Sequence, residues 1–102
     1  MKNEISLEKE IQDKGLNAPR LTPDLIDSVI TDCDYWFFPK AQLTICVLIL
    51  KNGFSVIGES ACASPENFNK EIGEKIAFEN ARSKIWQLEG YLLKEKLYNS
   101  KG

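Results

Sequence analysis

The clearest hydrophobic pattern of the chain lies between Leu43 and Leu97, where the period is first that of a strand and then that of a helix. The strand-like part, from Gln42 to Leu50, has two largely apolar faces. These faces carry Leu43, Ile45, Val47 and Ile49 on one side, and Thr44, Cys46, Leu48 and Leu50 on the other. A strand with two apolar faces is typical of a sheet covered on both sides. We therefore expect helices or a second subunit on each face.

A hairpin turn is predicted directly after this strand. Asn52-Gly53 is a strong hairpin signal, because a type I′ turn needs positive φ at both central residues. The return strand begins at Phe54 and contains Gly58. A glycine inside a strand often marks a bulge or a close approach of another backbone. The pattern thus predicts an antiparallel pair with a special position at Gly58.

One long helix is predicted after the hairpin. Ser64, Pro65 and Glu66 supply an N-cap, a proline at the first position and an acid in the first turn. The apolar residues that follow recur at helical spacing as Phe68, Ile72, Ile76, Ala77, Ala81, Ile85, Leu88 and Leu92. Gly90 interrupts this pattern, so the helix either continues through it or breaks there into two.

An earlier helix is predicted to begin at Thr22-Pro23-Asp24 and to end at about Cys33. The four aromatic residues Tyr35 to Phe38 come next and precede Pro39. They form either a strand or turn that covers the core, or an exposed patch for stacking or for an interface. Four adjacent rings can hardly all point inward, so we expect at least one, with Trp36 as the candidate, to face a groove or a partner.

These elements together predict an α+β protein with an N-terminal helix, an antiparallel hairpin or small sheet, and a long C-terminal helix. Residues 1–20 are expected to be a flexible arm, although a weak helix fits their pattern equally well. Residues 21–99 are expected to form a single domain. A chain of 102 residues buries a limited core, and pairing with further copies would add apolar burial. We therefore expect a homo-oligomer, either a dimer or a larger assembly.

Composition narrows the possible functions. Thirteen basic and 15 acidic residues are well mixed and give a net charge of −2, which argues against a nucleic-acid-binding protein. Three cysteines without a CxxC pair indicate reduced thiols in a cytosolic compartment. The first residues lack the apolar core of a signal peptide, and the apolar run Ile45–Leu50 is too short to span a bilayer. We expect an intracellular protein that does not bind membranes.

The sequence contains no pattern typical of an active site, a metal site or a cofactor site. Histidine is absent, which removes the commonest general base and metal ligand. The glycines form neither a P-loop nor a dinucleotide-binding motif. Glu71, Glu74 and Glu79 each have a Lys or Arg nearby, with pairs such as Lys70–Glu74, and are interpreted as a solvated helix face. We therefore expect no enzymatic activity, no metal and no cofactor.

One polar cluster interrupts the long apolar helix. Asn80, Arg82 and Lys84 lie at its middle, and Asn67 stands beside Phe68 at its predicted first turn. They are either surface and capping residues or part of a recessed anion pocket. In such a pocket the N-terminus of the helix offers free N–H groups to a phosphate, and Lys or Arg adds positive charge. The candidate ligand-binding residues are therefore Asn67, Phe68, Lys84, Arg82 and Trp36.

Several longer segments resemble the tailed-phage gene-49/gene-66 family of small accessory proteins. The resemblance rests on NGFSVIGESA, PENF, ENA and LEGYLL, together with TPDLIDSVI and YWFFP upstream, and covers roughly residues 21 to 97. Lys40-Ala41-Gln42 departs from the small Gly/Thr-rich run of the family, which puts the geometry of that corner in doubt. Membership implies a phage or prophage protein that is made in the host bacterial cytoplasm.

A second resemblance is to the phage anti-defence proteins of the first Thoeris type, which sequester cyclic ADP-ribose signals at a subunit interface. It implies that Asn67 and Lys84 contact the ligand. Lys84 would bind phosphate more weakly than an arginine at that position. Two hypotheses follow. The protein is either a non-enzymatic sponge for a cyclic nucleotide immune signal or an interaction module that binds and blocks a host protein. A sponge predicts a concave, partly basic pocket between subunits, whereas a blocking module predicts a flat apolar patch around Tyr35 to Phe38 with no pocket.

Overall fold

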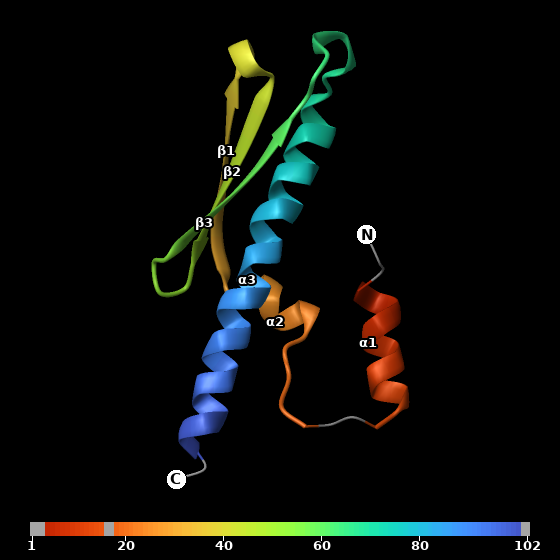
Figure 1. The fold of residues 1–102 in the computed structure, drawn as a ribbon, viewed down its shortest axis with the longest axis vertical. Coiled ribbons are helices and arrows are strands. Elements are labelled where there is room, and N and C mark those ends of the chain that lie inside the picture. The colour runs from red at the N-terminus through yellow and green to blue at the C-terminus, as the bar shows by residue number, and fades with distance from the viewer. Residues whose placement is uncertain (1–3, 16–17, 101–102) are drawn as a thin grey trace.

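The structure is a computed structural model that describes residues 4–15 and 18–100. Three helices and a three-stranded sheet follow one another in an order that confirms the predicted α+β class (Figure 1). The elements are α1 (Glu4–Asp13), α2 (Pro23–Ser28), β1 (Ile30–Phe38), β2 (Leu43–Leu50), β3 (Ser55–Ala61) and α3 (Lys70–Ser100), with short 3-10 turns η1 (Pro39–Ala41) and η2 (Pro65–Asn67).

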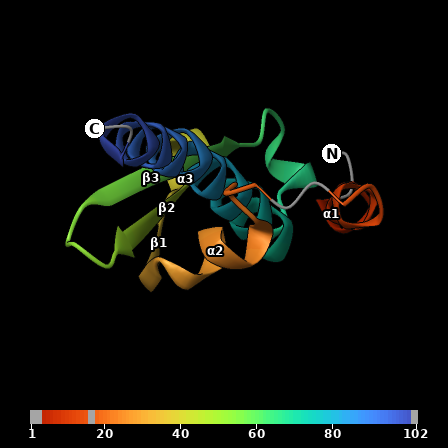
Figure 2. The same ribbon diagram turned by 90° about the horizontal axis from the view of Figure 1, so that it is seen from below.

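The sheet is antiparallel with the order β1-β2-β3, and its inner face packs against α3 (Figure 2). The residues of β2 alternate strictly, so that every second side chain is buried on this face. The core brings together one buried face of β2, parts of β3 and α2, and the sheet-facing stripe of α3. Its buried apolar members are Ile26, Cys46, Leu48, Leu50, Val56, Ala77, Ala81 and Ile85.

Gly58 lets α3 approach the sheet closely. A Cβ atom at this position would overlap the carbonyl oxygen of Ala77 and the amide nitrogen of Ala81. Small residues on α3 and a glycine on β3 therefore meet backbone to backbone, which confirms the predicted close approach. This contact fixes the helix across β2 and β3, so that a cleft separates the first turns of α3 from β1.

The outer face of the sheet is left largely uncovered by the described residues. Trp36, Phe38 and Ile57 are exposed there, and the outward residues of β2 are only half-buried. The described residues of this single chain thus cover the inner face as expected, but they do not cover the outer face. Figure 1 also shows that the C-terminal half of α3 extends beyond the end of the sheet.

The helix predicted to end at about Cys33 is wrong in its extent, because α2 ends at Ser28. Its start is as predicted, since the Thr22 side chain accepts a hydrogen bond from the backbone N–H of Leu25. From Ile30 the chain pairs with β2, and the β-branched Ile30 and Thr31 favour this extended state. The register shifts between Ile30 and Asp32, so Thr31 is the extra residue of a bulge.

The aromatic segment is part of β1, and strand alternation decides where its rings go. Tyr35 pairs with Cys46 on the inner face, and Trp36 pairs with Ile45 on the outer face. Trp36 and Phe38 share the outer face with ring centroids 5.9 Å apart. Both alternatives for this segment are therefore correct in part, because Tyr35 packs against the core and the other three rings are exposed.

The hairpin forms at the predicted place but with a different turn. Gly53 has φ +89°, whereas Gln42 is the only described non-glycine residue with positive φ, so Asn52 does not adopt the type I′ conformation. The N–H of Gly53 donates to the carbonyl of Leu50, and the N–H of Leu50 donates to that of Phe54. A tight turn followed by a left-handed glycine is the usual three-residue hairpin, so the type I′ prediction is wrong.

The long helix begins later than predicted and does not break. Pro65 opens the separate turn η2, and the Ser64 hydroxyl donates to Glu66 instead of capping α3. Asn69 caps α3, since its side chain accepts from the N–H of Ile72 at 3.0 Å. The helix is continuous through Gly90, where a Cβ would meet only Leu21 at 3.7 Å. Nothing in the backbone packing therefore requires a break.

The N-terminal residues contain α1, which stands apart from the sheet in both views (Figures 1 and 2). This helix buries none of its residues fully. The helical alternative for this segment is the one that the structure shows, and its flexibility stays a prediction. Within the described ranges, no helix is long and apolar enough to cross a membrane.

Candidate functional site

A cleft opens where the edge of β1 meets the first turns of α3. Its volume is about 440 Å³. We call it the aromatic cleft, and it is lined by Tyr35, Trp36, Phe37, Thr44, Phe68, Lys70 and Glu74. Its walls come from two strands, from the residue that follows η2 and from the first two turns of α3. The site therefore depends on the corner where chain segments distant in the sequence meet.

A ring stack forms one wall of the aromatic cleft. Phe37 and Phe68 lie with ring centroids 4.6 Å apart and planes inclined by 29°. The alternation of β1 places Phe37. Phe68 is held at the end of the turn η2, because the N–H groups of Asn67 and Phe68 donate to the carbonyls of Ser64 and Pro65. Stacked aromatic faces of this kind bind other flat rings well, because every planar ring offers a π-face.

A smaller pocket of about 130 Å³ adjoins the cleft and shares Thr44 and Phe68 with it. We call it the polar pocket, because amide and hydroxyl side chains line much of it: Gln42, Ser60, Asn67 and Asn69. Gln42 adopts the left-handed conformation with φ 49°, and its side chain donates to the carbonyl of Pro39. The left-handed backbone at Gln42 is strained for a residue other than glycine. Gln42 belongs to Lys40-Ala41-Gln42, where the sequence departs from the Gly/Thr-rich run of the family that it resembles.

Two charged side chains, Lys70 and Glu74, line the aromatic cleft without forming the ion pair that their spacing predicts. No described residue forms a hydrogen bond or ion pair with either side chain. Glu74 is only half-buried, and its charge acts on two inner-face groups, Tyr35 and Cys46. Glu74 is therefore less exposed than Glu71 on the same helix, and the predicted Lys70–Glu74 pair does not form.

The pKa values of those inner-face groups keep them protonated. Burial is the main cause that raises the pKa of Tyr35, and hydrogen bonding with Cys33 and the charge of Glu74 add to it. Burial likewise raises the pKa of the Cys46 thiol to about 12. The sulfur atoms of Cys33 and Cys46 lie 3.8 Å apart as free thiols. Cys46 is thus an unreactive core residue, since only the thiolate is a strong nucleophile.

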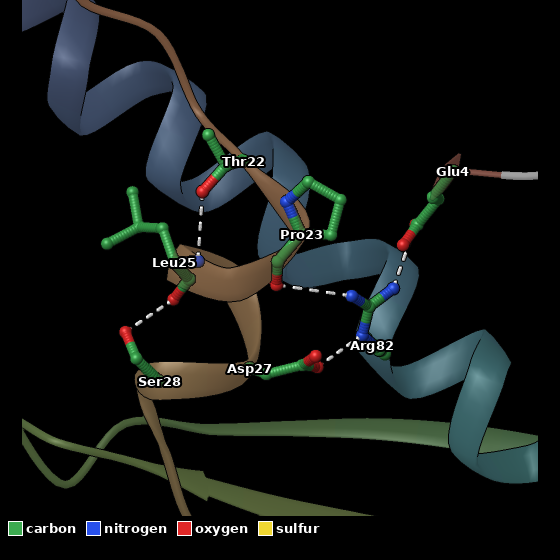
Figure 3. A network of polar contacts seen from close by, with 7 residues as sticks. All are labelled: Glu4, Thr22, Pro23, Leu25, Asp27, Ser28 and Arg82. Atoms are coloured by element: carbon green, nitrogen blue, oxygen red, sulfur yellow. Dashed lines mark hydrogen bonds and ion pairs between the residues drawn. The ribbon is translucent and has the colours of Figure 1, made fainter. Parts of the chain in front are cut away.

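Arg82 lies in a different place and is fully engaged (Figure 3). Its Nε donates to Asp27 of α2 at 2.7 Å, one terminal nitrogen donates to Glu4 of α1 at 2.8 Å, and the other reaches the carbonyl of Pro23 at 3.4 Å. The side chain is 9% exposed. The hydrogen bond with Glu4 is the main cause that raises the pKa of Arg82 further above its usual range. Arg82 therefore joins three helices.

Lys84 and Asn80 donate hydrogen bonds to backbone carbonyls of the edge strand β3. The Lys84 ammonium donates to the carbonyl of Ile57 at 2.6 Å, and the Asn80 amide donates to the carbonyl of Glu59 at 2.8 Å. Because β3 is an edge strand, its outward carbonyls lack a neighbouring strand. One helical turn apart on α3, the two side chains satisfy successive outward carbonyls of this edge.

The structure divides the five candidate ligand-binding residues into two groups. Trp36, Asn67 and Phe68 line the aromatic cleft and the polar pocket. Arg82 and Lys84 lie elsewhere and form the contacts described above. The residues that sequence reasoning missed are Phe37, Lys70 and Glu74. The i, i+4 spacing of Lys70 and Glu74 was visible, but only the pairing of β1 shows that this helix face turns toward a strand edge.

Residues 21–97 match the phage protein family described as N4 Gp49/phage Sf6 gene 66. The chain belongs to this family. No curated protein and no solved structure gives a significant match. The region that matches the N4 Gp49/phage Sf6 gene 66 family contains both pockets and Arg82, whereas α1 lies before it. Glu4, one of the partners of Arg82, therefore lies outside the matched region, whereas both pockets lie inside it.

Proposed function

We propose that this phage protein is a non-enzymatic sponge that binds a cyclic nucleotide immune signal, of the cyclic ADP-ribose type, and so lowers its free concentration. The observation that supports this proposal is the aromatic cleft with its adjoining polar pocket. Three of the five candidate residues line it, and they come from two segments of the chain, Trp36 from β1 and Asn67-Phe68 from the turn before α3. Sequestration needs binding alone, which fits a site built from rings, amides and hydroxyls.

The cleft suits a nucleotide in size and chemistry. Its volume of about 440 Å³ lies within the usual range of ligand pockets, roughly 300–1,000 Å³. A base stacks on the wall that Phe37 and Phe68 form, and such stacking is worth about 1–3 kcal/mol per base. The amides of Asn67 and Asn69 and the Thr44 hydroxyl supply hydrogen bonds for ribose oxygens. The nucleotide therefore finds both of the contacts that it needs.

The phosphates of such a ligand need more positive charge than one chain offers. Lys70 is the only basic residue that lines the cleft or the polar pocket among the described residues. We therefore include in the proposal a second copy of the chain, which contributes further cations at the mouth of the cleft. This homo-oligomer also explains how a small protein encloses a ligand that would otherwise stay exposed on one side.

Titration calorimetry with cyclic ADP-ribose isomers tests the proposal. Phe68→Ala removes the ring stack, and we expect it to weaken binding roughly tenfold to a hundredfold. Phe54→Ala is the matched control, because this phenylalanine is 55% exposed at the hairpin and lines neither pocket. Binding by the wild type that Phe68→Ala does not weaken would place the site elsewhere. The absence of binding to every cyclic nucleotide would overturn the sponge.

A second candidate function, the interaction module, is favoured by the uncovered outer face of the sheet. Trp36 and Phe38 are exposed there by 65% and 42%, beside the half-buried apolar residues of β2. Asp32, Asp34 and Glu59 share this face by register, whereas no Lys or Arg does. Two copies face to face would gather these carboxylates without a base. The face therefore fits a protein whose apolar surface is bordered by Lys or Arg.

Substitutions on the outer face test this alternative without touching either pocket. Phe38→Asp combined with Ile57→Asp is expected to abolish capture of a specific host protein and to leave nucleotide binding unchanged. Capture by the wild type should weaken with added salt, because charge complementarity is screened. Capture that survives the double substitution, or dimerisation of the wild type that the substitution abolishes, would contradict a host-protein site on this face.

A further inference from the structure

Glu74 is a half-buried carboxylate of α3 that lines the aromatic cleft. Glu71, on the same helix, is exposed. Within the described ranges, no side chain or backbone group donates a hydrogen bond to Glu74, and Lys70 one turn earlier does not pair with it. Yet its charge is close enough to act on Tyr35 and on Cys46. A half-buried carboxylate of this kind is costly to hold without a donor.

An ionised carboxylate only accepts hydrogen bonds, so the group that completes it must carry N–H or O–H. The Tyr35 hydroxyl interacts instead with Cys33. Phe37 and Phe68 select a flat ring on the same side of the cleft. An amino-substituted nucleobase meets both requirements, because it is a flat ring whose exocyclic amine donates at its edge.

We propose that Glu74 is the residue that selects the base, by accepting a hydrogen bond from the exocyclic amine of a base stacked on Phe68. This inference rests on the proposed function and adds the identity of the recognised group. Lys70 takes the other role and attracts the phosphates without reading the base. One turn of α3 thus presents one acceptor for the base and one cation for the phosphates.

The test compares two ligands that differ at one position. Cyclic ADP-ribose carries a nitrogen donor at C6 of the purine, and cyclic inosine diphosphate ribose carries a carbonyl oxygen there. With Glu74 ionised, the carbonyl would face a carboxylate, so we expect the wild type to bind the adenine ligand about tenfold more tightly. Titration calorimetry of both ligands with each variant gives this ratio directly.

Three variants separate selection of the base from general binding. Glu74→Gln should bring the ratio close to one, because an amide can donate to the carbonyl as well as accept from the amine. Lys70→Gln should weaken both ligands alike and leave the ratio unchanged. Glu71→Gln, the control on the exposed face, should change neither affinity nor ratio. A purely structural role for Glu74 would not change the ratio.

The outcomes distinguish this inference from the proposed function. Binding of both ligands with equal affinity by the wild type, or an unchanged ratio in Glu74→Gln, would overturn the role of Glu74 and leave the sponge standing. No binding of either ligand or of any other cyclic nucleotide would overturn the sponge and the inference together. A preference for the adenine ligand that Glu74→Gln removes supports both.

Discussion

Helix α3 carries two groups of charged residues that differ in how their hydrogen-bonding needs are met. Around Arg82, the guanidinium contacts Asp27, Glu4 and a backbone carbonyl, so all three of its nitrogens are engaged (Figure 3). Around the cleft, Lys70 and Glu74 are one helical turn apart, and no described residue forms a hydrogen bond or ion pair with either. The first group stabilises the fold, and the second has unused hydrogen-bonding capacity that, in our proposal, a ligand satisfies.

This difference shows that residue type alone does not identify a binding site. An arginine in the middle of an apolar helix suggests an anion pocket, yet its network already neutralises it. A glutamate four residues after a lysine suggests a solvated pair, yet the pair does not form. The distinction is whether a charged group that is partly removed from water already has partners, since an unpartnered one is costly.

The largest expected effect comes from breaking the Arg82 network. Arg82→Ala removes a buried side chain and leaves two carboxylates without their cation, so we expect a loss of about 2 kcal/mol in the free energy of unfolding. This figure is kept low because Asp27 is 59% exposed and water screens it. Urea unfolding measures the change. Unchanged stability, or a stable variant that has lost nucleotide affinity, would contradict a structural role.

A smaller effect on stability is expected at the cleft. Glu74→Gln breaks no ion pair or hydrogen bond with a described residue, so the free energy of unfolding should stay within about 0.5 kcal/mol of the wild type. The same urea experiment serves for both variants. Destabilisation of Glu74→Gln equal to that of Arg82→Ala would show that both groups are structural and would remove the contrast between them.

The smallest expected effect concerns α1. Besides the contact between Glu4 and Arg82, an ion pair between Glu8 and Arg20 attaches this helix to the chain that follows it. The hydrogen bonds from Arg20 lower the pKa of Glu8 below its ordinary value of 4.5. A carboxylate with a lowered folded pKa contributes stability above pH 4.5 and loses it as the pH falls through the folded value. We therefore expect α1 to loosen in that acidic range.

Trp86 reports this loosening, because it lines a cleft of about 320 Å³ together with residues of α1. Its fluorescence in a Trp36→Phe background should change as the pH falls below 4.5. Glu8→Gln should show the loosened signal already at neutral pH, with no further change from this pair on acidification. An identical acid transition in Glu8→Gln and the parent would show that Glu8 does not hold the helix.

Periodicity predicted β2, β3 and the long helix because those patterns reflect burial directly, whereas the first part of β1 was assigned to the preceding helix. The alternation of β2 and the small residue at Gly58 were visible in the sequence, and the structure places them as expected against α3. Local signals were less decisive at the ends of helices. Ser64-Pro65 and Asn69 both resemble starts, and only the packing of Phe68 on Phe37 separates the turn η2 from α3.

The candidate site was predicted in part. Asn67 and Phe68 were identified because they stand near an expected helix start, and Trp36 because it belongs to a run of four aromatic residues. Arg82 was misplaced because its partners are 55 and 78 residues away in the chain, beyond any local pattern. Glu74 was missed for the same reason, since its burial depends on the edge of β1 lying beside the first turns of α3.

Amide chemical shifts during a titration with cyclic ADP-ribose test the central claim most directly, because they show which of the two charged groups meets the ligand. The account predicts shifts that concentrate at Phe37, Phe68, Lys70 and Glu74, with little change at Asp27 and Arg82. Shifts that concentrate around Arg82 and α2, or the absence of shifts at saturating nucleotide, would contradict it.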